Sequence, residues 1–193
     1  MSTALVCSSH SPLLYCYDKP PQEWDAIQAA FQTSRDFVEA FNPELVFIFG
    51  TDHFNGFFLN TMPAFCVGLA AHAAADIGGF SGTIDVPENT AMQAIEYLRG
   101  NGLDPAVSYQ MTIDHGFSQT LQLMTGGLDA VPTIPIFINC ITRPFVPFER
   151  TILLGDRLGR FVDSLDKRVL FLASGGMSHH PTRYYPAFGE GEA

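Results

Sequence analysis

The sequence alternates between short apolar runs and longer segments in which apolar residues recur every three or four positions. Runs 45–49 and 133–138 are continuously apolar, which is typical of strands covered on both faces. Segment 24–41 instead carries its apolar residues at helical spacing. Because strands and helices that alternate along a chain favour parallel pairing, we predict a three-layer α/β/α fold with a mainly parallel, mixed central sheet.

The elements follow from the same pattern. The predicted strands are 4–8, 45–49, 65–69, 106–109, 133–138 and 169–173. Helices are predicted from Trp24 to Phe41, from Pro87-Glu88 to Gly100, over 117–124, and around Leu154, Leu158, Phe161 and Leu165. The Ala- and Gly-rich segment 70–82 fits no element clearly. We predict one domain over residues 1–181 and an irregular tail over 182–193.

The composition argues against some classes of binding partner. The net charge of −10 leaves no basic face for nucleic acid or for an anionic membrane surface. No apolar run reaches the ~20 residues that span a bilayer, and no signal peptide is visible, so a cytoplasmic location is expected. The four cysteines form no CxxC pair and are expected to be buried small hydrophobes in a reducing compartment.

Four histidines follow predicted strands, beside small or turn-forming residues. His10 follows the first strand, His53 follows strand 45–49, His115 lies between a strand and a helix, and His179 follows the last strand. Ligands of open parallel sheets bind at the carboxyl ends of the strands, where residues leaving adjacent strands converge. We therefore expect these imidazoles to share one pocket.

An imidazole can bind iron, zinc or copper, or transfer protons near neutral pH. Spacing alone does not divide the four histidines between these tasks. His72 does not follow a strand and is expected to be structural, whereas His180 competes with its neighbour His179. Asp52 and Asp114 directly precede two of the histidines, and could either orient imidazoles or form turns.

The motifs around these histidines resemble those of class III extradiol dioxygenases of the LigB type, along nearly the whole chain. The matching segments are S-H-S-P-L at 9–13, P-E-L-V at 43–46, D-H-F-N-G-F-F at 52–58, M-P-A-F-C at 62–66, D-H-G-F at 114–117, G-G-L-D at 126–129, V-P-T-I-P-I-F-I-N at 131–139 and K-R-V-L-F-L-A-S-G-G-M-S-H at 167–179. Several such segments in the same order along the chain as in the family make the resemblance specific.

The resemblance implies an iron(II) enzyme that opens a catechol ring beside its hydroxyl pair with O₂. It assigns His10 and His53 as iron ligands. It assigns acid–base catalysis to His115 and His179, of which His179 helps deprotonate the catechol and His115 donates a proton as the O–O bond breaks. The expected substrate is 2,3-dihydroxyphenylpropionate or 2,3-dihydroxycinnamate, and the expected role is the degradation of aromatic compounds.

The resemblance departs near the C-terminal end. Family members continue past the position of Ala193, and their carboxylate iron ligand lies in that continuation. Glu190 and Glu192 have surroundings unlike that ligand segment, so neither is assigned. The chain is expected to be a fragment of a longer enzyme or an impaired short form, and uncovered surfaces would favour a homo-oligomer. The alternatives are a non-catalytic LigB-like binding module without the metal carboxylate and, less favoured, a zinc hydrolase.

Substrate contacts are less defined by the sequence. Arg143 and Arg183 are candidate partners for a propionate carboxylate, although solvated loop positions explain both better. Phe54, Phe57 and Phe58 follow His53 closely in sequence. They could line an aromatic pocket or pack into the core.

Overall fold

The computed structural model describes residues 2–15 and 23–176, with the backbone alone at residues 13 and 15. The described elements are β1 (Ser2–Ser8), η1 (Pro12–Tyr15), α1 (Trp24–Phe41), β2 (Leu45–Gly50), β3 (Phe65–Gly68), β4 (Ala71–Ala73), β5 (Gly82–Ile84), α2 (Glu88–Gly100), β6 (Ala106–Ser108), β7 (Met111–Ile113), α3 (His115–Thr125), β8 (Thr133–Ile138), α4 (Phe148–Val162) and β9 (Arg168–Ser174). The predicted boundary at residue 181 and the predicted tail 182–193 lie outside the described residues.

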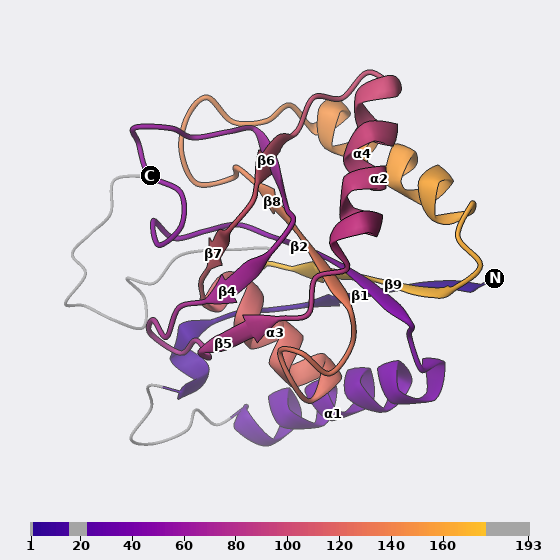
Figure 1. Cartoon of the computed structure of the whole chain (residues 1–193). Helices are drawn as coiled ribbons and strands as arrows, with labels where there is room; N and C mark the ends of the chain where they lie inside the picture. Colours follow the sequence, from indigo (N-terminus) through magenta and orange to yellow (C-terminus); the bar gives the residue numbers. More distant parts are fainter. Residues whose placement is uncertain (1, 16–22, 177–193) are drawn as a thin grey trace.

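The central sheet has the strand order β1-β9-β2-β8-β3-β6 (Figure 1). Strands β1, β9, β2 and β8 pair in parallel, and β3 pairs with β8 in antiparallel. β3 and β6 are parallel to each other. The predicted mainly parallel, mixed sheet is thereby confirmed. Because β1, β9 and β2 run the same way, their carboxyl ends lie together at one edge.

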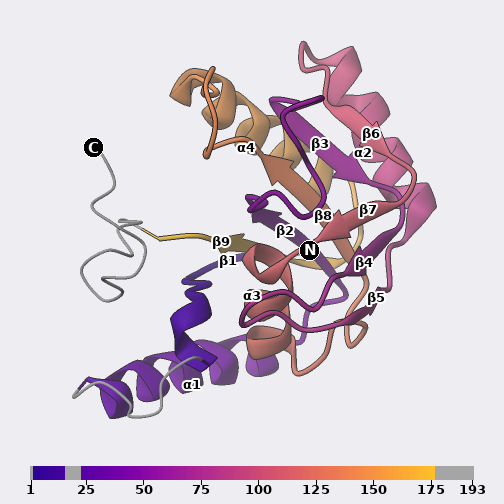
Figure 2. The same ribbon diagram turned by 90° about the vertical axis from the view of Figure 1, so that its left-hand side faces the viewer.

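Helices cover the sheet on both faces, which confirms the predicted three layers. On one face α1 and α3 enclose a core that contains Val38, Phe117 and Leu121. On the other face α2 and α4 enclose a second core around Leu98 and Leu158. The turned view in Figure 2 separates α1 and α3 from α2 and α4.

A second, three-stranded sheet has the order β5-β4-β7. Strand β4 lies in segment 70–82, and β5 begins at the end of that segment. No element was clearly predicted there. Each strand has only three residues, too few to establish an alternating pattern. Ala71, Ile84 and Ile113 place this sheet against the core on the α3 side.

Strand β1 is one of the two edge strands of the central sheet, and one of its faces is open. Leu5 is 64% exposed and Cys7 is exposed, whereas Val6 between them is buried. Cys140 is exposed as well, so the expectation of uniformly buried cysteines is wrong for these two. Of the described cysteines, Cys66 in β3 is buried, and burial raises the pKa of its thiol to about 12.

Helix α4 ends earlier than predicted. Its last residue is Val162, and Leu165 packs against the same core from the turn that follows. The amide of Leu165 donates to the carbonyl of Val162 at 2.9 Å. Apolar periodicity therefore extended the predicted helix past its true end. In the described part of the chain, no helix combines the length and apolarity needed to cross a membrane.

Helix α4 offers a matched test of the layered core. Leu158→Ala should lower the free energy of unfolding by about 2–5 kcal/mol, because this side chain is completely buried. Ile152→Ala on the same helix should change it by at most about 0.5 kcal/mol, because Ile152 is largely exposed. Urea unfolding measures both, and equal costs at the two positions would contradict this packing.

Candidate metal centre

Three histidines from distant parts of the chain meet at one place. One ring nitrogen of each of His10, His53 and His115 lies within 4.8 Å of one ring nitrogen of the others. The ring centroids of His53 and His115 are 4.2 Å apart with nearly parallel planes, and the ring of His10 stands 5.3 Å and 5.7 Å from them. The predicted gathering of these three imidazoles is therefore present in the structure.

His10 lies in the loop after β1, beside the end of β9. Ser8 pairs with Ser174 in the sheet, and the amide of Gly175 donates to the carbonyl of Ser8 at 3.0 Å. This pairing brings the hydroxyl of Ser174 to 2.9 Å from Nδ1 of His10. The side chain of His10 is buried, so its orientation is fixed by the two adjacent strand ends.

His53 is held by the carboxylate of Asp114. Oδ2 of Asp114 accepts from the backbone amide of His53 at 2.6 Å and lies 3.0 Å from its Nδ1. Oδ1 accepts from the amide of Gly116 at 2.8 Å, which caps the N-terminus of α3. Burial alone would raise the pKa of Asp114, but the hydrogen bonds from His53 outweigh burial and lower it.

His115 has its own carboxylate partner in Asp76. Oδ1 of Asp76 accepts from the amide of His115 at 2.8 Å, and Oδ2 is hydrogen-bonded to Nδ1 of the ring. Asp76 follows β4, a strand that sequence reasoning did not find. No motif marked Asp76, because it stands after a run of alanines in the ambiguous segment.

The two aspartates that precede histidines have different roles. Asp52 contacts the backbone amides of Asn55, Gly56 and Phe57 at 2.9–3.1 Å, so it forms the turn after β2. Burial raises the pKa of Asp52 above its ordinary value. Asp114 orients an imidazole, but that of His53 rather than that of its sequence neighbour His115.

Two glycines of the motifs are required by close backbone approach. A Cβ on Gly116 would lie 2.5 Å from the carbonyl oxygen of Thr51, which belongs to the turn that carries His53. A Cβ on Gly56 would clash with the carbonyl oxygen of Thr112 in β7. Glycine at these positions lets the turn after β2 pack against β7 and α3, and so lets His53 reach His115.

Other predicted residues lie elsewhere. His179, His180 and Arg183 are outside the described residues. His72 is exposed on β4, and is not among the three clustered histidines. Arg143 is exposed, with its guanidinium 5.9 Å from the ring centroid of Phe145.

The phenylalanines after His53 divide between core and surface. Phe57 stacks on Phe137, with ring centroids 4.1 Å apart, and packs against the core. Phe54 and Phe58 are 41% and 50% exposed. Core packing is therefore the observed role of Phe57 only.

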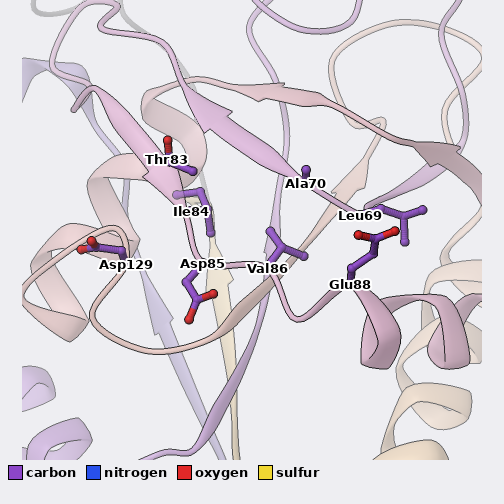
Figure 3. Close-up of a pocket in the computed structure, with 8 residues that line it drawn as sticks. All are labelled: Leu69, Ala70, Thr83, Ile84, Asp85, Val86, Glu88 and Asp129. Carbon is purple, nitrogen blue, oxygen red and sulfur yellow. The ribbon is translucent and has the colours of Figure 1, made fainter.

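Figure 3 shows a separate hollow of about 410 Å³, whose lining includes none of the three clustered histidines. Its wall includes Asp85, Glu88 and Asp129. The carbonyl of Asp85 accepts from the amide of Thr133, the first residue of β8, so the hollow lies at the amino end of that strand. The histidines lie at the opposite, carboxyl ends of β1 and β2.

The three imidazoles fit a divalent metal ion. The ring nitrogens lie within 4.8 Å of one another. Metal–nitrogen bonds of about 2.1 Å place two ligand atoms of one ion at most about 4.2 Å apart, so small side-chain movements would bring these nitrogens to ligand distance. The Nδ1 atoms of His53 and His115 face carboxylates, an arrangement that fixes ring orientation at metal sites. His10, His53 and His115 could each offer a ring nitrogen to such an ion.

Comparison with known proteins agrees with this geometry. The profile of the LigB family, the catalytic LigB subunit of aromatic ring-opening dioxygenase, matches residues 4–190. The chain belongs to the LigB family. The fold and the histidine cluster described above are thus those of a LigB-family chain.

Curated relatives of this LigB-family chain carry specific names. The 2,3-dihydroxyphenylpropionate/2,3-dihydroxicinnamic acid 1,2-dioxygenase 2 of Pseudomonas putida is 48% identical over 181 residues, which cover 94% of this chain and 58% of that protein. The corresponding dioxygenases of Rhodococcus rhodochrous and Escherichia coli are 48% and 45% identical, with the same coverage. The chain therefore spans somewhat more than half the length of these relatives.

The buried carboxylate of Asp114 should give stability a defined pH dependence. Because the pKa of Asp114 is lowered in the folded state, the ionised carboxylate contributes fully to stability above the ordinary aspartate pKa of 3.8. This contribution is lost as the pH falls through the folded-state pKa. Asp114→Asn should therefore lower the free energy of unfolding by about 1–3 kcal/mol at pH 7 and by less at acidic pH. Urea unfolding at several pH values measures the difference. The exposed Asp129→Asn is the control, and a pH-independent difference for Asp114→Asn would contradict this role.

Proposed function

We propose that this protein is an iron(II)-dependent extradiol dioxygenase that opens the ring of a catechol with O₂. The carrying observation is the convergence of three imidazoles: those of His10 and His53, which follow β1 and β2, and that of His115, which follows β7. The names of the relatives support 2,3-dihydroxyphenylpropionate or 2,3-dihydroxycinnamate as the substrate. This activity belongs to the degradation of aromatic compounds.

His10 and His53 are the proposed metal ligands. Nδ1 of His53 faces the buried carboxylate of Asp114, so its Nε2 is the nitrogen suited to bind the ion. Iron(II) held by these residues would supply open coordination positions for the two catechol oxygens and for O₂. The carboxylate of Asp114, behind the ring of His53, adds negative charge that favours a cation at this place.

His115 is the proposed proton donor. Asp76 holds both its backbone amide and Nδ1, which leaves Nε2 as the atom that exchanges a proton with the reacting oxygen. Its ring lies 4.2 Å from the ring of His53, which places it beside the proposed ligand. A positioned acid of this kind typically contributes about 10²–10⁴-fold to rate. His179, proposed as the base that deprotonates the catechol, lies outside the described residues.

The activity is tested with protein loaded with iron(II) without oxygen. Mixing with 2,3-dihydroxyphenylpropionate and O₂ should consume oxygen and give a yellow ring-opened product. Metal analysis should find about one iron per chain in a loaded sample, as two histidine ligands and an adjacent third imidazole imply. The proposal would be refuted if iron-loaded samples of this chain and of a full-length version both consumed no oxygen with any catechol. Failure to hold iron would instead support the non-catalytic binding module.

Substitutions separate the proposed ligands from the proposed acid. His10→Ala and His53→Ala should lose iron, whereas His115→Gln should keep iron and lower kcat by about 10²–10⁴-fold. The exposed His72→Gln is the matched control and should leave both quantities unchanged. Loss of iron in His115→Gln as well would show that His115 is a ligand instead.

A homo-oligomer and a cytoplasmic location remain predictions for this protein. Light scattering of the purified protein measures the subunit number. Cell fractionation in the source organism locates the protein.

A further inference from the structure

The hydroxyl of Ser174, at the end of β9, joins three elements. It is hydrogen-bonded to the carbonyl oxygen of Gly116, at the start of α3. Its Oγ also lies 2.9 Å from Oγ1 of Thr120 on α3 and 2.9 Å from Nδ1 of His10 after β1. Thr120 is fully buried, so this group of hydrogen bonds is shielded from solvent on the α3 side.

The direction of each hydrogen bond follows from counting protons. A serine hydroxyl has one hydrogen and two acceptor lone pairs. The carbonyl oxygen of Gly116 can only accept, so it takes the hydrogen of Ser174. Towards its other two partners, Oγ of Ser174 must therefore accept. The hydroxyl of Thr120 donates to Ser174, and so does Nδ1 of His10.

We propose that Ser174 is a positioning residue that keeps the proton of neutral His10 on Nδ1 and so presents an unprotonated Nε2 to a metal ion. A neutral imidazole carries one N–H, and a metal needs the nitrogen without it. The role of His10 as a ligand rests on the proposed function. The position of its proton is inferred from the hydrogen bonds of Ser174 and does not require that function.

Ser174 does for His10 what carboxylates do for the other two rings. Nδ1 of His53 faces Asp114, and Nδ1 of His115 faces Asp76. A hydroxyl can reverse its direction, whereas a carboxylate cannot. The carbonyl of Gly116 removes that freedom, because it fixes the hydroxyl hydrogen of Ser174 on the side away from His10.

The position of the proton can be observed without metal or substrate. In ¹⁵N-labelled, metal-free protein at pH 8, long-range ¹H–¹⁵N spectra distinguish a protonated from an unprotonated ring nitrogen. We expect His10 to show a protonated Nδ1 and an unprotonated Nε2, with the assignment made by loss of the signals in His10→Gln. A protonated Nε2 in the wild-type protein would overturn the proposal, and this measurement needs no variant of Ser174.

Variants test whether the hydroxyl causes this state. Ser174→Ala should shift His10 towards protonated Nε2 and weaken Co²⁺ binding, measured by titration, by about 10–100-fold. Ser174→Thr keeps a hydroxyl and should restore both. Ser118→Ala is the matched control, because that buried hydroxyl accepts from the amide of Phe80 rather than from an imidazole. Thr120→Val should leave Nδ1 of His10 protonated, because Thr120 donates to Ser174 without receiving its hydrogen.

The outcomes separate this proposal from the proposed function. If Ser174→Ala changes neither the position of the proton nor Co²⁺ affinity relative to Ser118→Ala, the positioning role of Ser174 is refuted. If the proton is on Nδ1 and moves in Ser174→Ala, but the iron-loaded protein opens no catechol, the proposed function fails while the role of Ser174 stands.

Discussion

The arrangement of the site depends on the hydrogen bonds that the carboxylate of Asp114 accepts. This side chain is fully buried, and its two oxygens accept from the backbone and ring of His53 and from the first turn of α3. One group therefore joins the turn after β2, the exit of β7 and the start of a core helix. A buried carboxylate is tolerated only when hydrogen bonds replace the water it has lost, and here they do.

The second constraint is the direction of the strands. Because β1, β9 and β2 are adjacent and parallel, His10, Ser174 and His53 leave the sheet at the same edge. The strand-like runs and the histidines that follow them were visible in the sequence, so the meeting of His10 and His53 could be predicted. His115 was also predicted to join them, but it comes from the second sheet, through β7, rather than from the central one.

Residues that orient the histidines were harder to find from sequence. Asp76 follows a three-residue strand, and its hydrogen bonds to His115 exist only because β4 and β7 pair. Ser174 directly follows the predicted strand 169–173, but its contact with His10 depends on which strands are neighbours in the sheet. The periodicity of apolar residues indicates which face of a helix or strand is buried, but not which elements lie beside it. The contacts of Asp76 and Ser174 could therefore be found only in the tertiary structure.

The position of His10 just after an edge strand has a consequence for how the fold could open. β1 is paired on one side only, with β9, and such terminal edge strands are where fraying begins. A cation shared by His10 and His53 would cross-link this edge strand to β2, two strands further into the sheet. Detachment of β1 would then require release of the ion, so occupancy of the site would decide how firmly the N-terminal strand is fastened.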